Sequence, residues 1–474
     1  MATVMTAPIA EAKLDDAAIE ELRGRLRGTL LTDDDPEYDE ARAVRNGLID
    51  RRPALIARCS GTADVVACVN FARERDLLLS VRGGGHNVAG NAVNDGGLVI
   101  DLSQMRGVYV DPAARTVRAQ GGATWGDVDP ETQRFGLATP GGVISSTGIA
   151  GLTLHGGVGW LRRAYGMSLD NLLSVEIVTA DGRVRQASAT EDPDLYWAVR
   201  GAGSNFGVVT SFEFKLHPVG PMVALAAPAY ALEDADRVIP AWRDFMLSAP
   251  DEISSHAIFW SVPAVEMFPA ELHGRPIVIP AAVYSGLAEE GEAALRPLRE
   301  LAEPLLDLSG AMPYATLQTG FDWAFPKGLL YYWKSLYLNG LDDAEITEVI
   351  DLAATRPSPL SLVALWHHGG AMARVGDSET AFGSRAAPYL VSFDTTWTDP
   401  ADTERAIAWT RDAWSAMHRF SDGGLYLNFP GFGEEKDALV RAGYGANYDR
   451  LAALKAKYDP GNLFRMNLNI PPAG

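Results

Sequence analysis

The chain has 474 residues, more than a single hydrophobic core usually holds, so we expect at least two domains. Apolar residues make up 47% and charged residues 22%, values ordinary for a globular protein. The net charge of -20 argues against nucleic acid and anionic membrane surfaces as partners.

Cysteine content and the N-terminal sequence indicate a cytoplasmic protein without a metal. The chain has only 2 cysteines, Cys59 and Cys68, too few for a disulfide framework and without metal-ligand spacing. Residues 1–26 lack the basic start and apolar stretch of a signal peptide, and no run of 18 apolar residues occurs.

The first part of the chain alternates short strands with helices. Residues 1–44 are expected to be an unstructured start followed by a polar helix at 17–27. Hydrophobic periodicity and turn residues then predict a βαβ unit and two hairpins. In chain order the elements are strand 55–58, helix 62–73, strand 77–81, strand 98–102, hairpin 107–110 with 116–119, a helix from 123 to about 136, hairpin 175–179 with 184–187, and strand 208–216.

The residue composition changes after His217-Pro218. Residues 219–424 alternate strands with helices (289–303 and 403–417) and hold 8 of the 11 tryptophans, which suits a large antiparallel sheet or a pocket for a flat ligand. A last helix is expected at 444–458.

Glycine clusters suggest a cradle for one long cofactor. They occur at 83–85, 139–142, 148–159 and 201–207. Glycine lets backbone N–H groups approach a pyrophosphate closely, and Arg82 would add a positive charge. Because no GxxxxGK[ST] is present and no GxGxxG opens a helix after a strand, a P-loop and a Rossmann site are both excluded.

Three motifs together resemble a known family. They are RGGGHN at 82–87, GGVGWL at 156–161 followed by YG at 165–166 and DN at 170–171, and RGAGSNFGVV at 200–209. These resemble the flavin domain of the vanillyl-alcohol-oxidase (p-cresol methylhydroxylase) superfamily. Residues 444–464 resemble the C-terminal segment of its berberine-bridge-enzyme-like members. The nearest likeness is to the bacterial branch with 6-hydroxy-D-nicotine oxidase and sugar oxidases.

The resemblance implies an α+β, two-domain FAD-binding fold of the p-cresol methylhydroxylase type with an antiparallel-sheet substrate domain. The FAD domain would comprise 45–217 and the berberine-bridge-like segment 425–474, and the substrate domain 218–424. FAD would be bound covalently through His86. The other cofactor-binding residues implied are Arg82, Gly83, Gly84, Gly85, Asn87, Val88, Thr139, Pro140, Gly141, Gly142, Ser145, Gly148, Ile149, Gly151, Leu154, His155, Gly156, Gly157, Trp160, Gly207, Val208, Val209, Tyr426 and Asn467.

One departure from the family limits the flavin to a single link. Many relatives attach it a second time through a cysteine, and Ile144 stands at that place. Thr147 replaces the usual Val or Leu beside the flavin, which leaves the choice between oxidase and dehydrogenase open.

The residues for proton transfer are expected around Tyr426, in a segment that matches the family's Tyr-x-Asn strand. A phenol is a weak base at neutral pH, so a cation would have to lower its pKa; Lys334, Arg162 and Arg163 are the candidates. His367 or His368 could line the substrate pocket, but not both, since neighbours on a strand face opposite sides. The expected catalytic residues are Tyr426, Lys334 and His367. Glu379, Asp377 and Asp394 are expected to be solvated.

The resulting hypothesis is an FAD-linked oxidase that takes hydride from an alcohol or sugar, with oxygen as acceptor. The alternatives are an amine oxidase acting on a cyclic amine, a dehydrogenase with another acceptor, and a non-catalytic flavin-binding protein. The partners are therefore a small-molecule donor and molecular oxygen.

Overall fold

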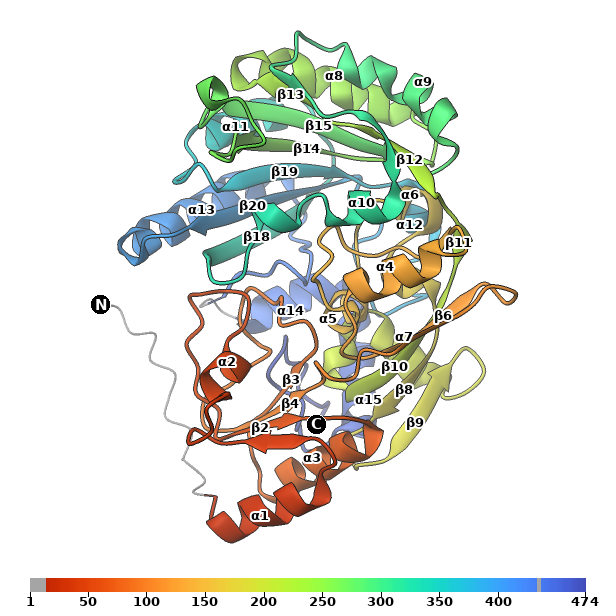
Figure 1. The fold of residues 1–474 in the computed structure, drawn as a ribbon, viewed down its shortest axis with the longest axis vertical. Coiled ribbons are helices and arrows are strands. Elements are labelled where there is room, and N and C mark those ends of the chain that lie inside the picture. Colours follow the sequence, from red (N-terminus) through yellow and green to blue (C-terminus); the bar gives the residue numbers. More distant parts are fainter. Residues whose placement is uncertain (1–13, 433–435) are drawn as a thin grey trace.

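The computed structural model describes residues 14–432 and 436–474. It mixes helices with mostly antiparallel sheet (Figure 1). The unstructured start predicted from the sequence falls largely on residues 1–13, outside the described part. In the part that the structure describes, no helix is long and apolar enough to cross a membrane.

A small four-stranded sheet forms the N-terminal end of the fold. Its strand order is β1-β2-β4-β3, and β2 and β3 both pair in parallel with β4. Helix α3 connects β2 to β3, which confirms the predicted βαβ unit. The elements are α1 (Asp16–Arg25), β1 (Thr29–Leu31), α2 (Tyr38–Arg42), β2 (Leu55–Arg58), α3 (Thr62–Glu74), β3 (Leu79–Arg82) and β4 (Leu98–Asp101).

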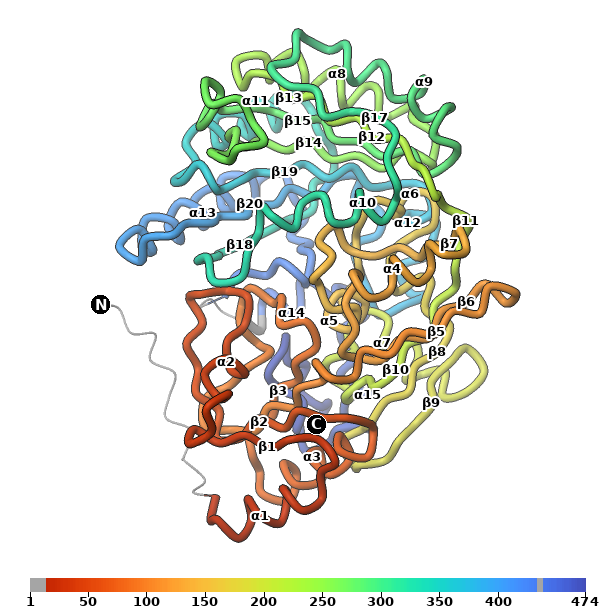
Figure 2. The backbone as a smooth tube through the Cα atoms, viewed as in Figure 1, coloured from red at the N-terminus to blue at the C-terminus, as the bar shows by residue number. Residues whose placement is uncertain are grey.

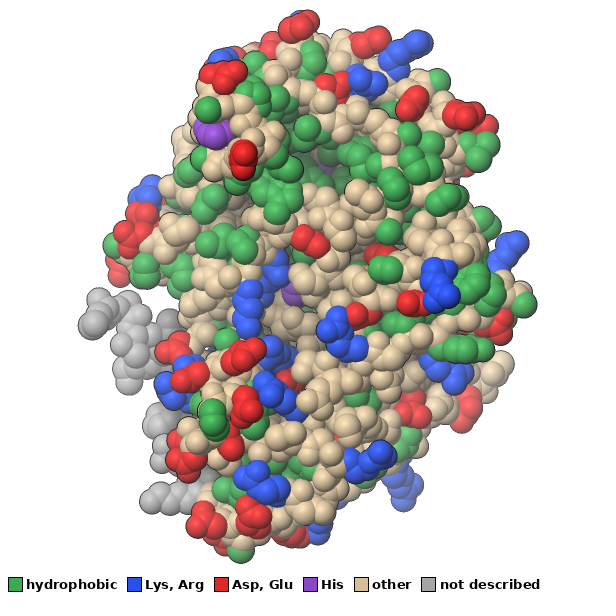
Figure 3. Space-filling view, in the orientation of Figure 1, with side chains coloured by type: hydrophobic (Ala, Val, Ile, Leu, Met, Phe, Trp, Pro, Cys, Tyr) green, Lys and Arg blue, Asp and Glu red, His purple; other side chains and the backbone are tan. Residues whose placement is uncertain are grey.

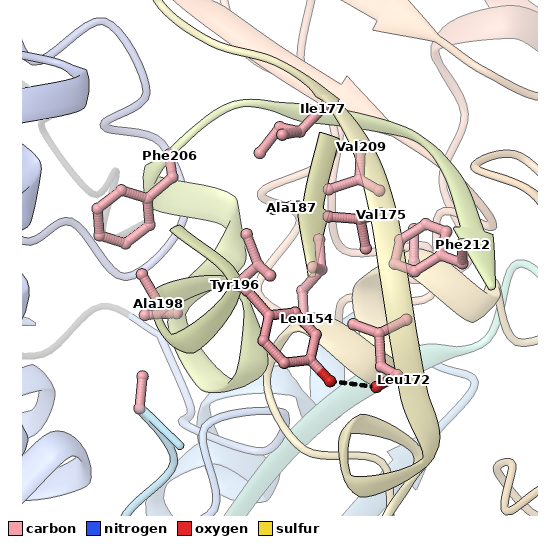
Figure 4. Close-up of a cluster of buried hydrophobic side chains, with 14 of the residues drawn as sticks. Leu154, Leu172, Val175, Ile177, Ala187, Tyr196, Ala198, Phe206, Val209 and Phe212 are labelled. Atoms are coloured by element: carbon pink, nitrogen blue, oxygen red, sulfur yellow. Dashed lines mark hydrogen bonds between the residues drawn. The ribbon is translucent and has the colours of Figure 1, made fainter. Parts of the chain in front are cut away.

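A five-stranded antiparallel sheet follows, with the order β5-β6-β10-β8-β9. Both predicted hairpins are present, as β5 with β6 and β8 with β9. One face packs on α7, where the Tyr196 hydroxyl donates to the Leu172 carbonyl at 2.5 Å (Figure 4). The elements are β5 (Val108–Asp111), β6 (Thr116–Gln120), α4 (Trp125–Gln133), β7 (Leu137–Ala138), α5 (Ile149–Leu154), α6 (Arg162–Tyr165), β8 (Leu172–Val178), β9 (Val184–Ser188), α7 (Pro193–Ala202), β10 (Val208–Lys215) and β11 (His217–Pro218).

A nine-stranded sheet fills the other half of the molecule, and helices α8, α9, α11 and α13 cover its outer face (Figures 1 and 2). Seven strands run in the order β16-β13-β15-β14-β19-β20-β18, with β12 and β17 paired beside them. The elements are β12 (Met222–Ala226), β13 (Pro228–Ala231), α8 (Ala235–Ser248), β14 (Ile253–Ser261), β15 (Pro276–Tyr284), α9 (Ala288–Arg299), β16 (Leu306–Asp307), β17 (Gly310–Pro313), α10 (Tyr314–Thr319), β18 (Leu330–Leu338), α11 (Asp343–Ala354), β19 (Leu362–His367), α12 (Gly370–Arg374), β20 (Tyr389–Trp397) and α13 (Thr403–Met417).

The C-terminal segment returns to the first half of the chain. Tyr444, Leu451 and Leu454 join the same core as the five-stranded sheet. The single predicted helix at 444–458 is wrong in extent: α14 (Lys436–Tyr444) and α15 (Tyr448–Tyr458) are separated by one short turn. Residues 425–428 also differ from the expected strand, because they form a turn-containing loop.

Candidate functional site

A long cavity lies between the glycine-rich loops and the inner face of the nine-stranded sheet. One end is lined mainly by the glycine segments 83–85 and 148–159, and the other by strands β14, β18, β19 and β20. Hydrophobic side chains gather around a hollow over this sheet (Figure 3). Of the described residues that line the cavity, only Arg45 and Asp394 carry an Arg, Lys, Asp or Glu side chain.

The glycine turn after β3 brings two backbones into direct contact. Gly85 has a φ of +66°, in the region that favours glycine. A Cβ on Gly84 would lie 2.4 Å from the Gly148 nitrogen, so the two loops cross only because neither has a side chain there. A Cβ on Gly151 would meet nothing within 4 Å, which leaves room toward the cavity.

His86 follows this turn and lines the cavity. Arg45 Nη1 lies 2.9 Å from His86 Nε2. Because a guanidinium only donates, Nε2 accepts, and the ring proton sits on Nδ1, 3.2 Å from Thr147 Oγ1. Burial, together with the charge of Arg45, holds the pKa of His86 well below its usual value. His86 is therefore a neutral imidazole with a fixed tautomer.

The C-terminal segment closes the glycine-lined end, where Phe464, Met466 and Asn467 face the cavity. They are held by Lys455, whose Nζ donates to Asp459 at 2.5 Å and to the Phe464 carbonyl at 2.8 Å. Asp459 accepts from the Phe464 amide at 2.9 Å. This buried ion pair fixes the chain where it meets the cavity.

Tyr426 lies at the junction between the glycine loops and the sheet, and it is only 2% exposed. Its hydroxyl oxygen accepts from the Gly157 amide at 3.1 Å, the Val158 amide at 3.3 Å and Asn428 Nδ2 at 2.9 Å. Burial nevertheless raises the pKa of Tyr426, against the lowering effect of these donors. The phenol therefore keeps its proton at neutral pH.

Asp394 lines the same cavity from β20, in register with Trp333 on β18 and Leu362 on β19. Its predicted solvation is wrong, because the residue is only 6% exposed. Ser392 Oγ lies 3.3 Å from Oδ2, whereas Oδ1 has no hydrogen-bond partner within the described residues. Burial raises the pKa of Asp394 to about 7, so this carboxyl titrates near neutral pH.

Two predicted catalytic residues point away from the cavity. The Lys334 ammonium lies 4.1 Å from the centre of the Trp414 ring, and His367 packs edge-on against Tyr389 at 5.2 Å. Burial lowers the pKa of His367 to about 3. Their neighbours Trp333 and Trp366 line the cavity instead. Strand alternation therefore excludes Lys334 and His367 from contact with a ligand there.

The two arginines proposed to act on Tyr426 are also engaged elsewhere. Arg162 donates to the carbonyls of Gly159, Ser255 and His367. Arg163 donates to the carbonyls of Pro250 and Ile253. Both guanidiniums hold backbone, whereas the hydrogen bonds to the Tyr426 hydroxyl come from the N–H groups of amides.

Most glycine-loop predictions do fall on the cavity wall. The residues that line it are Gly83, Gly84, Gly85, His86, Asn87, Val88, Gly142, Gly148, Gly151, Leu154, His155, Gly207, Val209, Tyr426 and Asn467. His155 is neutral because burial lowers its pKa to about 4, and its Nε2 lies 2.9 Å from Ser204 Oγ.

The other predicted cofactor residues lie behind the wall. Arg82 donates to the Ala41 carbonyl, Ser145 donates to Asp322 at 2.8 Å through its amide, and Trp160 stacks on His256 with ring centres 4.5 Å apart. Thr139, Pro140, Gly141, Ile149, Gly156, Gly157 and Val208 likewise do not line the cavity. They lie in or next to the segments that carry the lining residues.

Sequence reasoning missed Arg45, His256 and Asp394, which all line the cavity. Arg45 lies 41 positions before His86, and no local pattern marks it. Across the described residues, no group of three His, Cys, Asp or Glu side chains could hold a metal ion.

Comparison with known proteins gives two family matches. Residues 53–188 match the model of an FAD binding domain, and residues 425–471 match the model "Berberine and berberine like". The chain is 32% identical to (R)-6-hydroxynicotine oxidase of Paenarthrobacter nicotinovorans over 463 residues, covering 95% of this chain and 98% of that one.

Solved structures agree with this match. 6-Hydroxy-D-nicotine oxidase from Arthrobacter nicotinovorans superposes with a TM-score of 0.83 at 30% identity, covering 94% of this chain and 98% of the other. A chitooligosaccharide oxidase superposes with a TM-score of 0.84 at 25% identity, covering 96% and 100%.

Proposed function

Because the chain belongs to the berberine-bridge-enzyme-like family of FAD-linked oxidoreductases, we propose that it is an oxidase acting on a small alcohol. The hydride would leave the carbon that bears the hydroxyl, and dioxygen would be the final acceptor. The observation that carries this proposal is that three groups line one cavity: the neutral imidazole of His86, the phenol of Tyr426 and the titratable carboxyl of Asp394.

The glycine-lined end fits FAD on its own chemistry. Gly151 leaves space where a side chain would intrude, and the backbone amides of a glycine turn suit a pyrophosphate. Leu79, Val81 and Val209 offer apolar contacts at this end for a flat ring. When bound, FAD supplies the two-electron acceptor for the hydride.

His86 would hold the cofactor covalently. Nucleophilic attack needs a neutral imidazole, and the low pKa of His86 provides one. Attachment through Nε2 would displace the 2.9 Å contact with Arg45, whereas attachment through Nδ1 would release the proton on Nδ1 and would leave Arg45 to hold the ring. Ile144, which also lines the cavity, has no nucleophilic atom, so we expect a single link.

Asp394 would be the base that accepts the hydroxyl proton. Its pKa of about 7 makes it partly ionised at neutral pH, which is where a general base works best. Tyr426 would be an anchor instead of a base. Its oxygen is occupied by three N–H donors, so its own O–H is free to donate to the substrate oxygen.

The overall reaction balances as alcohol plus dioxygen giving ketone or aldehyde plus hydrogen peroxide. One C–H and one O–H bond of the donor break, and a C=O bond forms. The two electrons and two protons end on dioxygen.

The test is peroxide formation coupled to oxygen consumption, with a panel of alcohols and amines as donors. We expect one peroxide per oxygen consumed with an alcohol. If the flavoprotein reacts only with amines, the proposed alcohol oxidation is wrong and the protein is an amine oxidase. A flavoprotein reduced by a donor but inert toward oxygen would be a dehydrogenase.

A further inference from the structure

The sheet-lined end of the cavity is almost entirely apolar. Strands β14, β19, β18 and β20 present to it Ile258, Leu362, Ala364, Trp366, Trp333 and Leu390. These side chains alternate along each strand with others that face the helices, so the pattern is set by the register of the sheet. Asp394 contributes the single carboxylate among the described residues that line the cavity.

Aromatic rings form a continuous wall from this end to Tyr426. Phe325 and Trp333 meet edge to face with centres 5.9 Å apart, Trp333 and Phe429 at 5.4 Å, and Phe429 and Tyr426 at 5.2 Å. Edge-to-face packing of this kind holds each ring in one orientation. The wall therefore presents fixed apolar surface to whatever lies beside the Tyr426 hydroxyl.

Two further polar groups belong to side chains that line this end: the indole N–H of Trp333, which has no hydrogen-bond partner within the described residues, and the imidazole of His256. The His256 ring lies between Trp160 and Trp366, with ring centres 4.5 Å and 4.4 Å away. Burial keeps the pKa of His256 well below its usual value, so the imidazole is neutral, with one donor and one acceptor nitrogen.

The few polar groups on this part of the cavity wall disfavour a sugar as the substrate. A sugar carries a hydroxyl on nearly every ring carbon, and each one buried without a partner costs about 1–3 kcal/mol. Beyond the groups that would handle the reacting hydroxyl, the wall near this end offers His256, the indole N–H of Trp333 and the amide of Asn428, fewer hydrogen-bonding groups than a sugar ring and its substituents need. An apolar ring, by contrast, gains about 25 cal/mol for each Å² it removes from water.

We propose that the substrate is a compact, largely apolar ring alcohol, aromatic or alicyclic. Its reacting hydroxyl lies at Tyr426 and Asp394, and at most one further polar group faces His256. This inference rests on the proposed function, since it names the donor for the same oxidation: the carbinol C–H and O–H are lost, a ring ketone or aldehyde forms, and dioxygen becomes peroxide.

The experiment uses the purified flavoprotein and matched probes without and with multiple hydroxyls. 1-Indanol and cyclohexanol are compared with D-glucose and cellobiose, first by flavin bleaching without oxygen and then by peroxide formation with it. The ketones 1-indanone and cyclohexanone, which do not react, measure binding by perturbation of the visible flavin spectrum. We expect the ring compounds to bleach or perturb the flavin, and the sugars to do neither.

Leu390→Gln places an amide in the apolar, sheet-lined end of the cavity. The control is Leu247→Gln, which changes a residue of α8 that is 72% exposed. If the amide is left unpaired, we expect the first variant to lower kcat/KM for the ring alcohol between about fivefold and a hundredfold, mainly through KM. The second variant should change it less than about twofold, as expected of an exposed surface position.

The failures are distinguishable. Bleaching by sugars but not by ring alcohols, or no spectral response to either ring ketone, would overturn the substrate inference and leave an FAD oxidase. Protein that carries no flavin would overturn the proposed function itself, and the substrate inference with it.

Discussion

Replacing Asp394 by Asn removes the carboxyl that we assign as the base while keeping its size. General bases contribute about 10²- to 10⁴-fold to rate, so we expect kcat/KM for an alcohol donor to fall within that range. In the parent protein, a pKa of about 7 means that the ionised fraction rises about tenfold between pH 6 and pH 8. The rate of flavin reduction should rise with it, and the Asp394→Asn variant should lose this dependence.

Other groups near the cavity do not produce the same profile. Burial keeps His256 neutral by lowering its pKa and keeps Tyr426 neutral by raising its pKa, so neither changes charge between pH 6 and 8. The assay is anaerobic stopped-flow reduction of the flavin by an alcohol, which measures the chemical step without reoxidation.

Asp129 offers a matched control. It is also buried, burial also raises its pKa to about 7, and its Oδ2 accepts from Gln318 at 3.0 Å, but it does not line the cavity. Asp129→Asn should leave the pH profile of flavin reduction intact. If the Asp394→Asn variant kept the full rate and profile, or if the Asp129→Asn variant lost them equally, the assignment of the base would be wrong.

Stability gives a second readout for the same carboxyl. The folded pKa of about 7 lies above the unfolded value of 3.8, so the native state binds the proton more tightly. The resulting stability is complete below about pH 4 and is lost as pH rises through 7, by about 4 kcal/mol over three pH units. Asp394→Asn should remove this contribution from the curve of unfolding free energy against pH and leave the similar contribution of Asp129.

Three other substitutions test separate parts of the account. Tyr426→Phe removes the anchor but not the base, so kcat/KM should fall at least about tenfold while flavin content and the pH profile stay; a lost profile would make Tyr426 the base. Gly84→Ala places a Cβ 2.4 Å from the Gly148 nitrogen and should cost at least about 1–3 kcal/mol of unfolding free energy, whereas Gly61→Ala, which meets nothing within 4 Å, should cost little; equal effects would refute the close crossing. Lys455→Met leaves Asp459 buried without its cation and should destabilise by about 3–5 kcal/mol in denaturant titrations; an unchanged midpoint would contradict the role given to this pair.

The glycine end of the site could be predicted from sequence because its chemistry is local. A strand, a glycine turn and His86 are adjacent in the chain, so the turn alone fixes where the imidazole points. The cation beside it could not be predicted in the same way. Arg82 is adjacent but turns to the Ala41 carbonyl, while Arg45 reaches Nε2 from 41 positions upstream.

The predictions for the sheet-lined end of the cavity were wrong for a different reason: side chains alternate between the two faces of a strand. Lys334 and His367 are each one residue from a cavity-lining tryptophan, and a shift of one position moves a side chain to the other face. Asp394 lies on a strand buried on both faces. Because Ser392 and Asp394 alternate with apolar residues, the sequence predicts a strand with one solvated face. In the structure Asp394 on that face lines a cavity.

The link between His86 and the flavin is tested most directly by the mass and colour of the denatured protein. The parent chain should stay yellow after precipitation and weigh one FAD more than its sequence, whereas His86→Ala should release all of its flavin into the supernatant. A colourless pellet from fully loaded parent protein, or a yellow pellet from the alanine variant, would contradict the central claim.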